Sequence, residues 1–350
     1  TLKDVCTINM GQSPDSDSYN DNGEGVPFFQ GNADFGERYP VTRKWCSAPT
    51  KMAAPEDILI SVRAPIGAMN YAKEECCIGR GLAALTPDKT KVSPKFIFWL
   101  LKGKNAELNS KGTGSTFKAI GRKVLEETKV PDISLEKQLE HSETLEKIYA
   151  VIQHRKSELQ MLDDLIKARF VEMFNLSDCI YKSLGECTDF VDYRGHTPEL
   201  SDEGIIRMVN AKSVGKGFFK YVDEFVTEET YDAWMHRGFG YPGDILFVTE
   251  GHTFGNTCLI PEDMTKFALG QRVITIKGKE EIKNAFLCSY MQTDMFWKDI
   301  NVYRTGGTAQ GIRSKDLVKV MVPIPPIEQQ IEFVRFVHKV DKSKVVEIIN

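Results

Sequence analysis

The sequence predicts an α+β protein built from two tandem mixed α/β domains, each followed by a long helix. Three observations support this fold class. The 350 residues, 41% hydrophobic and 27% charged, are enough for two domains with separate cores. Motifs in the first half of the chain recur in the same order in the second half. Apolar residues with helical spacing follow each copy, and the two helices that they predict would form a coiled-coil-like spacer.

The repeat is carried by three sets of matched residues. Gly114, Ile120, Leu125 and Gln138 recur 192 positions later as Gly306, Ile312, Leu317 and Gln330. The segment PEDILI (Pro55–Ile60) recurs as PGDILF (Pro242–Phe247), and GQSP (Gly11–Pro14) recurs as GHTP (Gly195–Pro198). Insertions in surface loops account for the small drift in the offset. An ordered set of this kind indicates a duplication of one structural unit.

Each copy places short β-rich runs between clusters of Gly, Pro and Asn and then enters a helix. In the first copy the predicted strands are Val26–Phe29, Ile58–Val62 and Leu82–Leu85, and the helix is Phe96–Leu101. In the second copy they are Ile205–Val209, Ile245–Val248 and Val273–Ile276, with a helix near Asn284–Met291. Because the strands precede the helix instead of alternating with helices, we expect α+β domains and not βαβ units.

A proline-marked segment ends each copy and leads into a long helix. The predicted organisation is two domains at 1–134 and 177–326 and two helices at 135–176 and 327–350. Nearly forty helical residues would make the first helix a rod of roughly 55–60 Å. Its apolar stripe, interrupted by Arg155 and Arg169, comprises Leu145, Ile148, Ile152, Leu159, Leu162, Ile166 and Met173. We expect this rod to hold the domains apart and to pair with the second helix, which carries Ile331, Val334, Val337 and Val340; an ordinary amphipathic core helix is the alternative.

Several classes of protein are disfavoured by the composition. No apolar run approaches the roughly 18 residues that span a bilayer, and the first residues lack the pattern of a signal peptide, so we expect a cytoplasmic protein. The eight cysteines form no C-x-x-C pair, and no His pair completes a zinc pattern, so we expect reduced thiols and no metal. The absence of a phosphate-binding loop or a strand-embedded G-x-G-x-x-G leaves nucleotide binding without support.

The net charge of −4 argues against a generally basic surface. Residues 1–134 carry 18 basic and 16 acidic side chains, and residues 177–326 carry 17 and 21. Neither domain therefore has a surface that is basic overall, and any nucleic-acid site must be a local patch on a near-neutral surface.

Four segments closely resemble the specificity subunits of type I restriction-modification systems: Ile133–Phe174, Pro323–Gln330, Val340–Lys344 and Cys77–Ala84. The resemblance spans almost the whole chain. It implies two target-recognition domains, separated by two conserved antiparallel helices, that each read one half of an asymmetric split site in double-stranded DNA. One departure is that the second helix has only about two dozen residues; either the sequence is truncated or the distal part of the first helix has another partner.

The resemblance also implies the partners. Modification subunits, which bind S-adenosylmethionine, and restriction subunits, which use ATP and Mg²⁺, would assemble around a specificity subunit that catalyses nothing and holds no cofactor. The positions expected to dock subunits are Leu145, Ile148, Ile152, Leu159, Leu162, Ile166, Ile331 and Val334.

The candidate DNA-binding residues are polar or basic side chains in glycine-bearing loops, although each of them could also be a solvated loop residue or a turn former. In the first copy they are Gln30, Asn32, Arg63, Arg80, Ser115, Thr116 and Lys118. In the second copy they are Asn210, Lys212, His252, Arg272, Thr308, Gln310 and Arg313. Arg80 and Arg272 rank highest because they follow the matched pairs Ile-Gly and Leu-Gly.

An enzyme and a protein-binding adaptor are the two functions that compete with DNA recognition. An enzyme is disfavoured because the chain has no N-P-P-[YF] motif or cofactor loop, E-I-K (Glu281–Lys283) lacks a spaced acidic partner, and no nucleophile or carboxylate is placed beside His252. An adaptor whose coiled coil recruits proteins without touching DNA would explain the acidic second domain. The adaptor remains the alternative.

Overall fold

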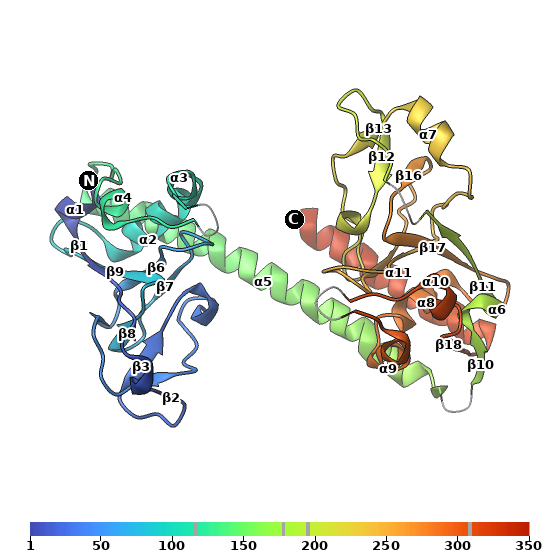
Figure 1. The fold of residues 1–350 in the computed structure, drawn as a ribbon, viewed down its shortest axis with the longest axis horizontal. Helices are drawn as coiled ribbons and strands as arrows, with labels where there is room; N and C mark the ends of the chain where they lie inside the picture. The colour runs from blue at the N-terminus through green and yellow to red at the C-terminus, as the bar shows by residue number, and fades with distance from the viewer. Residues whose placement is uncertain (115–117, 177–178, 194–196, 307–309, 350) are drawn as a thin grey trace. The chain divides into compact units, whose positions relative to one another are not determined.

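The computed structural model describes residues 1–114, 118–176, 179–193, 197–306 and 310–349 (Figure 1). The chain forms two compact units, Thr1–Gln153 and His154–Asn350, and the division falls inside the helix α5 (Leu135–Met173). Each unit therefore contains one repeat and a part of this 39-residue helix.

The first unit is built on a four-stranded antiparallel sheet in the order β1-β9-β6-β7 (Figure 1). Its strands are β1 (Cys6–Met10), β9 (Leu82–Pro87), β6 (Ile58–Ser61) and β7 (Met69–Tyr71). The strand β6 is apolar at successive positions because both of its faces are covered. Ile58 and Ile60 pack in the cluster that contains Ile97 and Leu101, whereas Leu59 packs with Phe29 in a different cluster.

A second sheet and several short helices complete the first unit. The sheet has the order β2-β4-β3-β8-β5, with β3 and β8 parallel. Its strands are β2 (Tyr19–Asn20), β4 (Trp45–Cys46), β3 (Val26–Phe29), β8 (Cys76–Ile78) and β5 (Met52–Ala53). The helices are α1 (Leu2–Val5), α2 (Pro94–Gly103), α3 (Asn105–Ser110), α4 (Arg122–Glu126) and the 3₁₀ turns η1 (Ser16–Ser18) and η2 (Asn32–Asp34).

The second unit repeats this plan. The sheet β11-β17-β14-β15 is antiparallel, the sheet β13-β12-β16 has a parallel β12–β16 pair, and β10 pairs with β18. The strands are β10 (Ile180–Ser183), β11 (Thr188–Asp192), β12 (Ile206–Val209), β13 (Phe225–Val226), β14 (Ile245–Val248), β15 (Thr257–Leu259), β16 (Phe267–Leu269), β17 (Val273–Gly278) and β18 (Met321–Ile324). The helices are α6 (Leu184–Cys187), α7 (Glu228–Trp234), α8 (Asn284–Tyr290), α9 (Asp294–Tyr303), α10 (Ser314–Leu317), α11 (Ile327–Ile349) and the 3₁₀ turn η4 (Ala211–Ser213).

The strand registers of the two units match. Ile58 of β6 pairs with Leu85 of β9, and Ile245 of β14 pairs with Ile276 of β17. The strand β14 also divides its side chains between two cores, as β6 does. The predicted fold class of two tandem α/β domains is confirmed, and the strands predicted from apolar runs lie where they were expected.

In the second unit, α5 and α11 pack against each other through aromatic side chains. The ring of Phe333 lies 5.4 Å from that of Phe170 and 5.5 Å from that of Phe174, measured between centroids. Arg169 contacts Phe336 further along α11, whereas Met173 at the end of α5 and Ile327 at the start of α11 line the same cavity, so the two helices run antiparallel. The predicted stripe omitted Phe170 of α5 and Phe174, which directly follows α5, because this end of the helix also faces the core of the second repeat, which includes Phe286.

The positions that were predicted to dock subunits differ in exposure between the units. Within the first unit Leu145, Ile148 and Ile152 are 40%, 50% and 46% exposed. Within the second unit Leu159, Leu162, Ile166, Ile331 and Val334 are half-buried. Among the described residues, no helix is long and apolar enough to cross a membrane.

A buried glutamine fastens the first turns of each long helix to its own repeat. Gln138 Oε1 accepts from the Ser93 amide (2.9 Å), and Gln138 Nε2 donates to the Ile133 carbonyl oxygen (2.9 Å). Gln330 Oε1 accepts from the Lys283 amide (2.8 Å), and its Nε2 donates to the carbonyl oxygens of Pro325 (2.8 Å) and Glu281 (3.0 Å). The recurrence of glutamine at an offset of 192 thus reflects a shared buried contact.

The first repeat makes an additional contact with α5, the long helix that follows it. Among the described residues, the second repeat has no equivalent contact with α11. Arg38 pairs with Glu146 of α5, and its guanidinium lies 4.9 Å from the centre of the Tyr149 ring. Trp99 Nε1 also donates to Glu146 Oε1 (2.9 Å). Gly217 occupies the equivalent turn of the second repeat, as shown by the bonds from Gly36 N to Tyr39 O and from Gly215 N to Phe218 O, so no side chain can form this contact.

Candidate nucleic-acid interface

Backbone hydrogen bonds join the candidate loops of the first repeat into one surface. These loops follow β3, β6 and β8 and precede α4. The bonds run from Gly79 N to Phe29 O (2.8 Å), Val62 N to Gly81 O (2.9 Å), Ala64 N to Lys118 O (3.0 Å) and Ile120 N to Val62 O (2.9 Å). The surface is therefore held by main-chain atoms and does not depend on which side chains the loops carry.

Cationic side chains project from this first surface. Arg63, Arg80 and Lys118 are all exposed, and within the described part of the chain none of them has an ion-pair partner. Gln30 is exposed beside them, while Asn32 begins η2 and is half-buried. Three free cations within linked loops are suited to phosphate oxygens and to guanine.

The same bonds recur in the second repeat. They run from Gly270 N to Val209 O (2.8 Å), Thr249 N to Arg272 O (2.8 Å), Gly251 N to Gln310 O (2.9 Å) and Ile312 N to Thr249 O (2.9 Å). Isolated bridges also match, because Arg63 bridges to Ala119 and Glu250 bridges to Gly311. The linked loops of each repeat form its tip. Each position in the tip of one repeat therefore corresponds to one position in the tip of the other.

This pairing changes the relation between the two highest-ranked candidates. Arg63 corresponds to Glu250, Arg80 to Gln271, and Lys118 to Gln310. Arg272 corresponds to Gly81, one residue after Arg80, because Val62 N and Thr249 N bond to the carbonyl oxygens of Gly81 and Arg272. Arg80 and Arg272 thus lie in equivalent loops of the two repeats, but their positions within these loops are not equivalent.

At the second surface, two arginine side chains are engaged by an ion pair and a hydrogen bond. Arg272 Nε donates to Glu250 Oε1 (3.0 Å), and the two side chains are 53% and 51% exposed. Arg304 Nη1 donates to Gln310 Oε1 (3.2 Å). His252 is exposed in the adjoining loop.

Asn210 and Lys212 belong to a separate polar cluster. Asn210 caps η4 by accepting from the Lys212 amide (2.9 Å), and its Nδ2 donates to Glu224 Oε2 (2.6 Å). Lys212 also pairs with Glu224. Hydrogen bonding to Lys212 lowers the pKa of Glu224 against the opposing effect of burial, and the bond from Asn210 adds to the lowering. The Asn210 amide therefore already serves a structural role.

The remaining candidates are Arg313, Ser115, Thr116 and Thr308. Arg313 is exposed and directly precedes α10. Ser115, Thr116 and Thr308 lie outside the described residues. The set of DNA-contacting residues as a whole stays a prediction.

Sequence reasoning missed Glu250, Gln271 and Arg304. Glu250 lies 187 positions after Arg63, which is the offset of the neighbouring PEDILI motif, so a comparison at that offset would have found it. Gln271 and Arg304 carry no comparable signal. They were found because the backbone bonds align the loops.

The described residues offer no metal site of at least three His, Cys, Asp or Glu side chains. The thiols are poorly suited to act as nucleophiles, since burial raises the pKa of Cys76 and that of Cys6 to about 12. Glu281 of the E-I-K segment pairs with Lys182 (2.8 Å).

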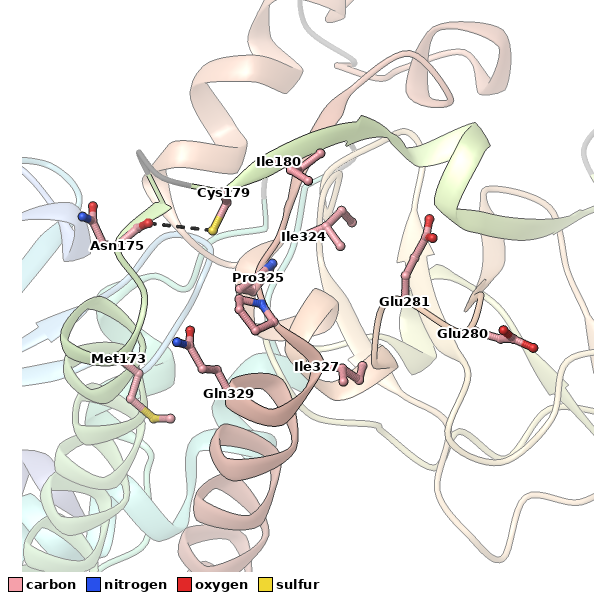
Figure 2. Close-up of a pocket in the computed structure, with 11 residues that line it drawn as sticks. Met173, Asn175, Cys179, Ile180, Glu280, Glu281, Ile324, Pro325, Ile327 and Gln329 are labelled. Carbon is pink, nitrogen blue, oxygen red and sulfur yellow. Dashed lines mark hydrogen bonds between the residues drawn. The ribbon is translucent and has the colours of Figure 1, made fainter.

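A cavity of about 830 Å³ lies in the second unit, where α5 ends and α11 begins. Figure 2 shows Met173 on α5 and Gln329 on α11, with the Cys179 thiol donating to the Asn175 carbonyl oxygen (3.8 Å). The residues that line the cavity also include Ile180, Ile324 and Glu280. No candidate DNA-binding residue is among the lining residues. The cavity is therefore separate from the loop surface.

Comparisons with known proteins agree with this arrangement. The family described as "Type I restriction modification DNA specificity domain" matches twice, over residues 1–161 and 189–350. A protein of Methanocaldococcus jannaschii with the provisional name type I restriction enzyme MjaX specificity subunit is 44% identical over 156 residues. That match covers 45% of this chain and only 37% of the relative.

Two solved structures are similar to this chain. The HsdS subunit from Thermoanaerobacter tengcongensis is 46% identical, with 43% of this chain and 36% of that chain covered and a TM-score of 0.39. The type I restriction-modification S subunit from M. genitalium is 16% identical, covers 99% of this chain and 90% of its own, and has a TM-score of 0.56, which shows a shared fold. Because both repeats match the family over most of their length, the chain belongs to the type I restriction-modification DNA specificity family.

Proposed function

We propose that this chain is the sequence-recognition subunit of a type I restriction-modification complex. Each repeat reads one half of a bipartite, asymmetric site in double-stranded DNA. The observation that carries the proposal is that both repeats hold a cluster of exposed loops with the same backbone bonds but with different side chains. Matching frames with unlike side chains suit two readers of unlike half-sites.

The proposal assigns no catalysis to this chain. Modification subunits supply the methyltransferase activity with S-adenosylmethionine, and restriction subunits supply ATP- and Mg²⁺-dependent translocation and cleavage. The exposed apolar positions Leu145, Ile148 and Ile152 of α5 support docking of these partners, since exposed apolar stripes mark interaction sites. The complex acts on DNA in the cytoplasm.

Methylation mapping tests the proposal. A host genome that carries this gene should contain methylated adenines in one split, asymmetric motif, and deletion of the gene should remove them. Exchange of residues 1–134 for those of a homologue should change one half of the motif only. A methylome without a split motif, or one unchanged by the deletion, would contradict the proposal.

The adaptor hypothesis has one observation in its favour, namely the same exposed stripe on α5. It predicts that the chain captures protein partners without any sequence-dependent retention of DNA. Chromatography of the complex on matched DNA resins, with and without the mapped motif, separates the two functions.

A further inference from the structure

We infer that Arg272, oriented by Glu250, reads a guanine in the half-site of the second repeat. This inference rests on the proposed function and adds to it the identity of a base and of the residue pair that selects it. Arg272 is the base-contacting residue, and Glu250 is a positioning residue.

The geometry of the pair leaves the base-reading edge of the guanidinium open. Glu250 Oε1 accepts from Nε of Arg272 (3.0 Å), so the carboxylate occupies one side of the guanidinium. Within the described residues, the two Nη groups have no hydrogen-bond partner. Two Nη donors in one plane match the O6 and N7 acceptors of guanine in the major groove.

The backbone at Arg272 is strained. Its φ is +69°, a left-handed conformation that is unfavourable for a residue with a side chain. The equivalent residue of the first repeat is Gly81, where a Cβ atom would lie only 2.5 Å from the Gln30 carbonyl oxygen. The second repeat therefore has a side chain at a position where the first repeat has a glycine.

The neighbouring carboxylate favours a base over a phosphate as the contact of Arg272. An ion pair with Glu250 offsets the positive charge and weakens attraction to any phosphate, whatever the sequence. It also fixes the plane of the guanidinium, which lowers the entropy cost of a bidentate contact. The first repeat has Arg63 where the second has Glu250, so it lacks this arrangement.

The chain offers a matched control for the strain. Glu56 is the other residue with a side chain and a positive φ among the described residues, and its φ is also +69°. It too forms an exposed ion pair, with Lys89 (3.1 Å), and it too corresponds to a glycine, Gly243, in the other repeat. Glu56 precedes β6, whereas the candidate loop surface follows it.

The experiment selects bound sequences from a pool of random duplexes, using the full chain with its modification subunits. Wild-type protein should select a split motif with a guanine in one half. Arg272→Gly removes both donors, so preference for that guanine should fall roughly 5- to 150-fold while the other half stays unchanged. Arg272→Lys keeps the charge but replaces the planar pair of Nη donors with one ammonium group, so preference for the guanine should fall by less. Glu250→Gln should relax the same position to a smaller extent.

Thermal unfolding separates this role from a structural one. Arg272→Gly and Glu56→Gly both relieve a left-handed residue and remove an exposed ion pair, so both should keep or raise the melting temperature. Only Arg272→Gly should lose the guanine. A wild-type split motif that survives in Arg272→Lys and Arg272→Gly would overturn this inference alone, whereas a wild-type protein that selects no split motif would overturn the proposed function as well.

Discussion

The two repeats are alike where the chain is buried and different where it meets solvent. Gln138 and Gln330 occupy equivalent buried sites and make equivalent bonds at the heads of the two long helices. At the tips, the exposed residues Arg63, Arg80 and Lys118 correspond to Glu250, Gln271 and Gln310. The two repeats therefore share the contacts that define the fold and differ in the side chains that face solvent.

The difference at the tips is mainly one of charge. Three cations of the first repeat, which have no ion-pair partner among the described residues, correspond to one acidic and two neutral residues in the second repeat. The second tip has other cations, of which Arg272 pairs with Glu250 and Arg304 donates to Gln310. The first tip should thus contribute more to electrostatic attraction and the second more to selection between bases.

The largest expected effect is on the shared buried glutamines. Gln330→Ala would leave one amide and two carbonyl groups without partners, and we expect it to destabilise the second repeat by about 3 kcal/mol. Gln138→Ala breaks one bond fewer and should cost about 2 kcal/mol in the first repeat. Hydrogen exchange measured by mass spectrometry should show the loss of protection around Lys283 or Ser93, respectively.

The matched controls are the exposed neighbours of these glutamines. Gln329→Ala and Lys137→Ala remove side chains that face solvent and should leave exchange unchanged. If the buried and exposed variants behaved alike, the two helix heads would not be held by the glutamines.

The next effect concerns the three cations of the first tip. Replacing Arg63, Arg80 and Lys118 together by alanine should lower the slope of log affinity against log salt by about 2.7, if each contacts one phosphate. Between about 0.05 and 0.2 M salt this is a roughly 40-fold smaller loss of affinity. The measurement is a salt titration of binding to a duplex that carries the mapped motif.

The corresponding double variant of the second tip, Gln271→Ala with Gln310→Ala, should leave that slope unchanged because neither residue is charged. An equal change of slope in both variants would show that the two tips do not differ in their phosphate contacts.

A smaller effect separates the two parts of α5. Ile166→Ala removes a side chain packed against the aromatic core of the second unit and should cost about 2 kcal/mol. Ile148 is 50% exposed in the first unit, so Ile148→Ala should change stability by less than about 0.5 kcal/mol. Hydrogen exchange of the chain without partners measures both, and protection of Ile148 on addition of modification subunits would identify it as a docking position.

The smallest effect is a pH dependence at a position where the two repeats carry different residues. Glu224 has a lowered pKa, so its stabilising contribution is complete above the unfolded value of about 4.5 and is lost as the pH falls towards the lower folded value. The equivalent residue of the first repeat is Lys44, as the bonds from Phe28 N and Met208 N indicate. Glu224→Gln should therefore lower the melting temperature at pH 7 and have a diminishing effect below about pH 4.5.

Much of the fold could be predicted from the sequence because its strands are short apolar runs. Ile58–Ser61 and Ile245–Val248 are buried on both faces, and an apolar run records that burial directly. The repeat was visible for a related reason, since matched residues such as Gln138 and Gln330 occupy matched buried sites.

The tips could be predicted only in part. Glycine-bearing loops were identified, but the correspondence of Arg272 with Gly81 depends on which carbonyl oxygen each amide reaches, and that is a property of the folded backbone. The aromatic packing of Phe170 and Phe333 was missed because helical spacing reports which residues share a face and does not report what that face meets.

The main-chain bonds that hold the tip loops have an evolutionary consequence. Loops whose shape does not depend on their side chains can accept new residues one at a time while the rest of the protein stays folded. An arginine codon and a glutamine codon can differ by a single base, so an exchange such as that between Arg80 and Gln271 lies one mutational step away. New target specificities can then arise by gradual drift of an existing subunit, without passing through intermediates that fail to fold.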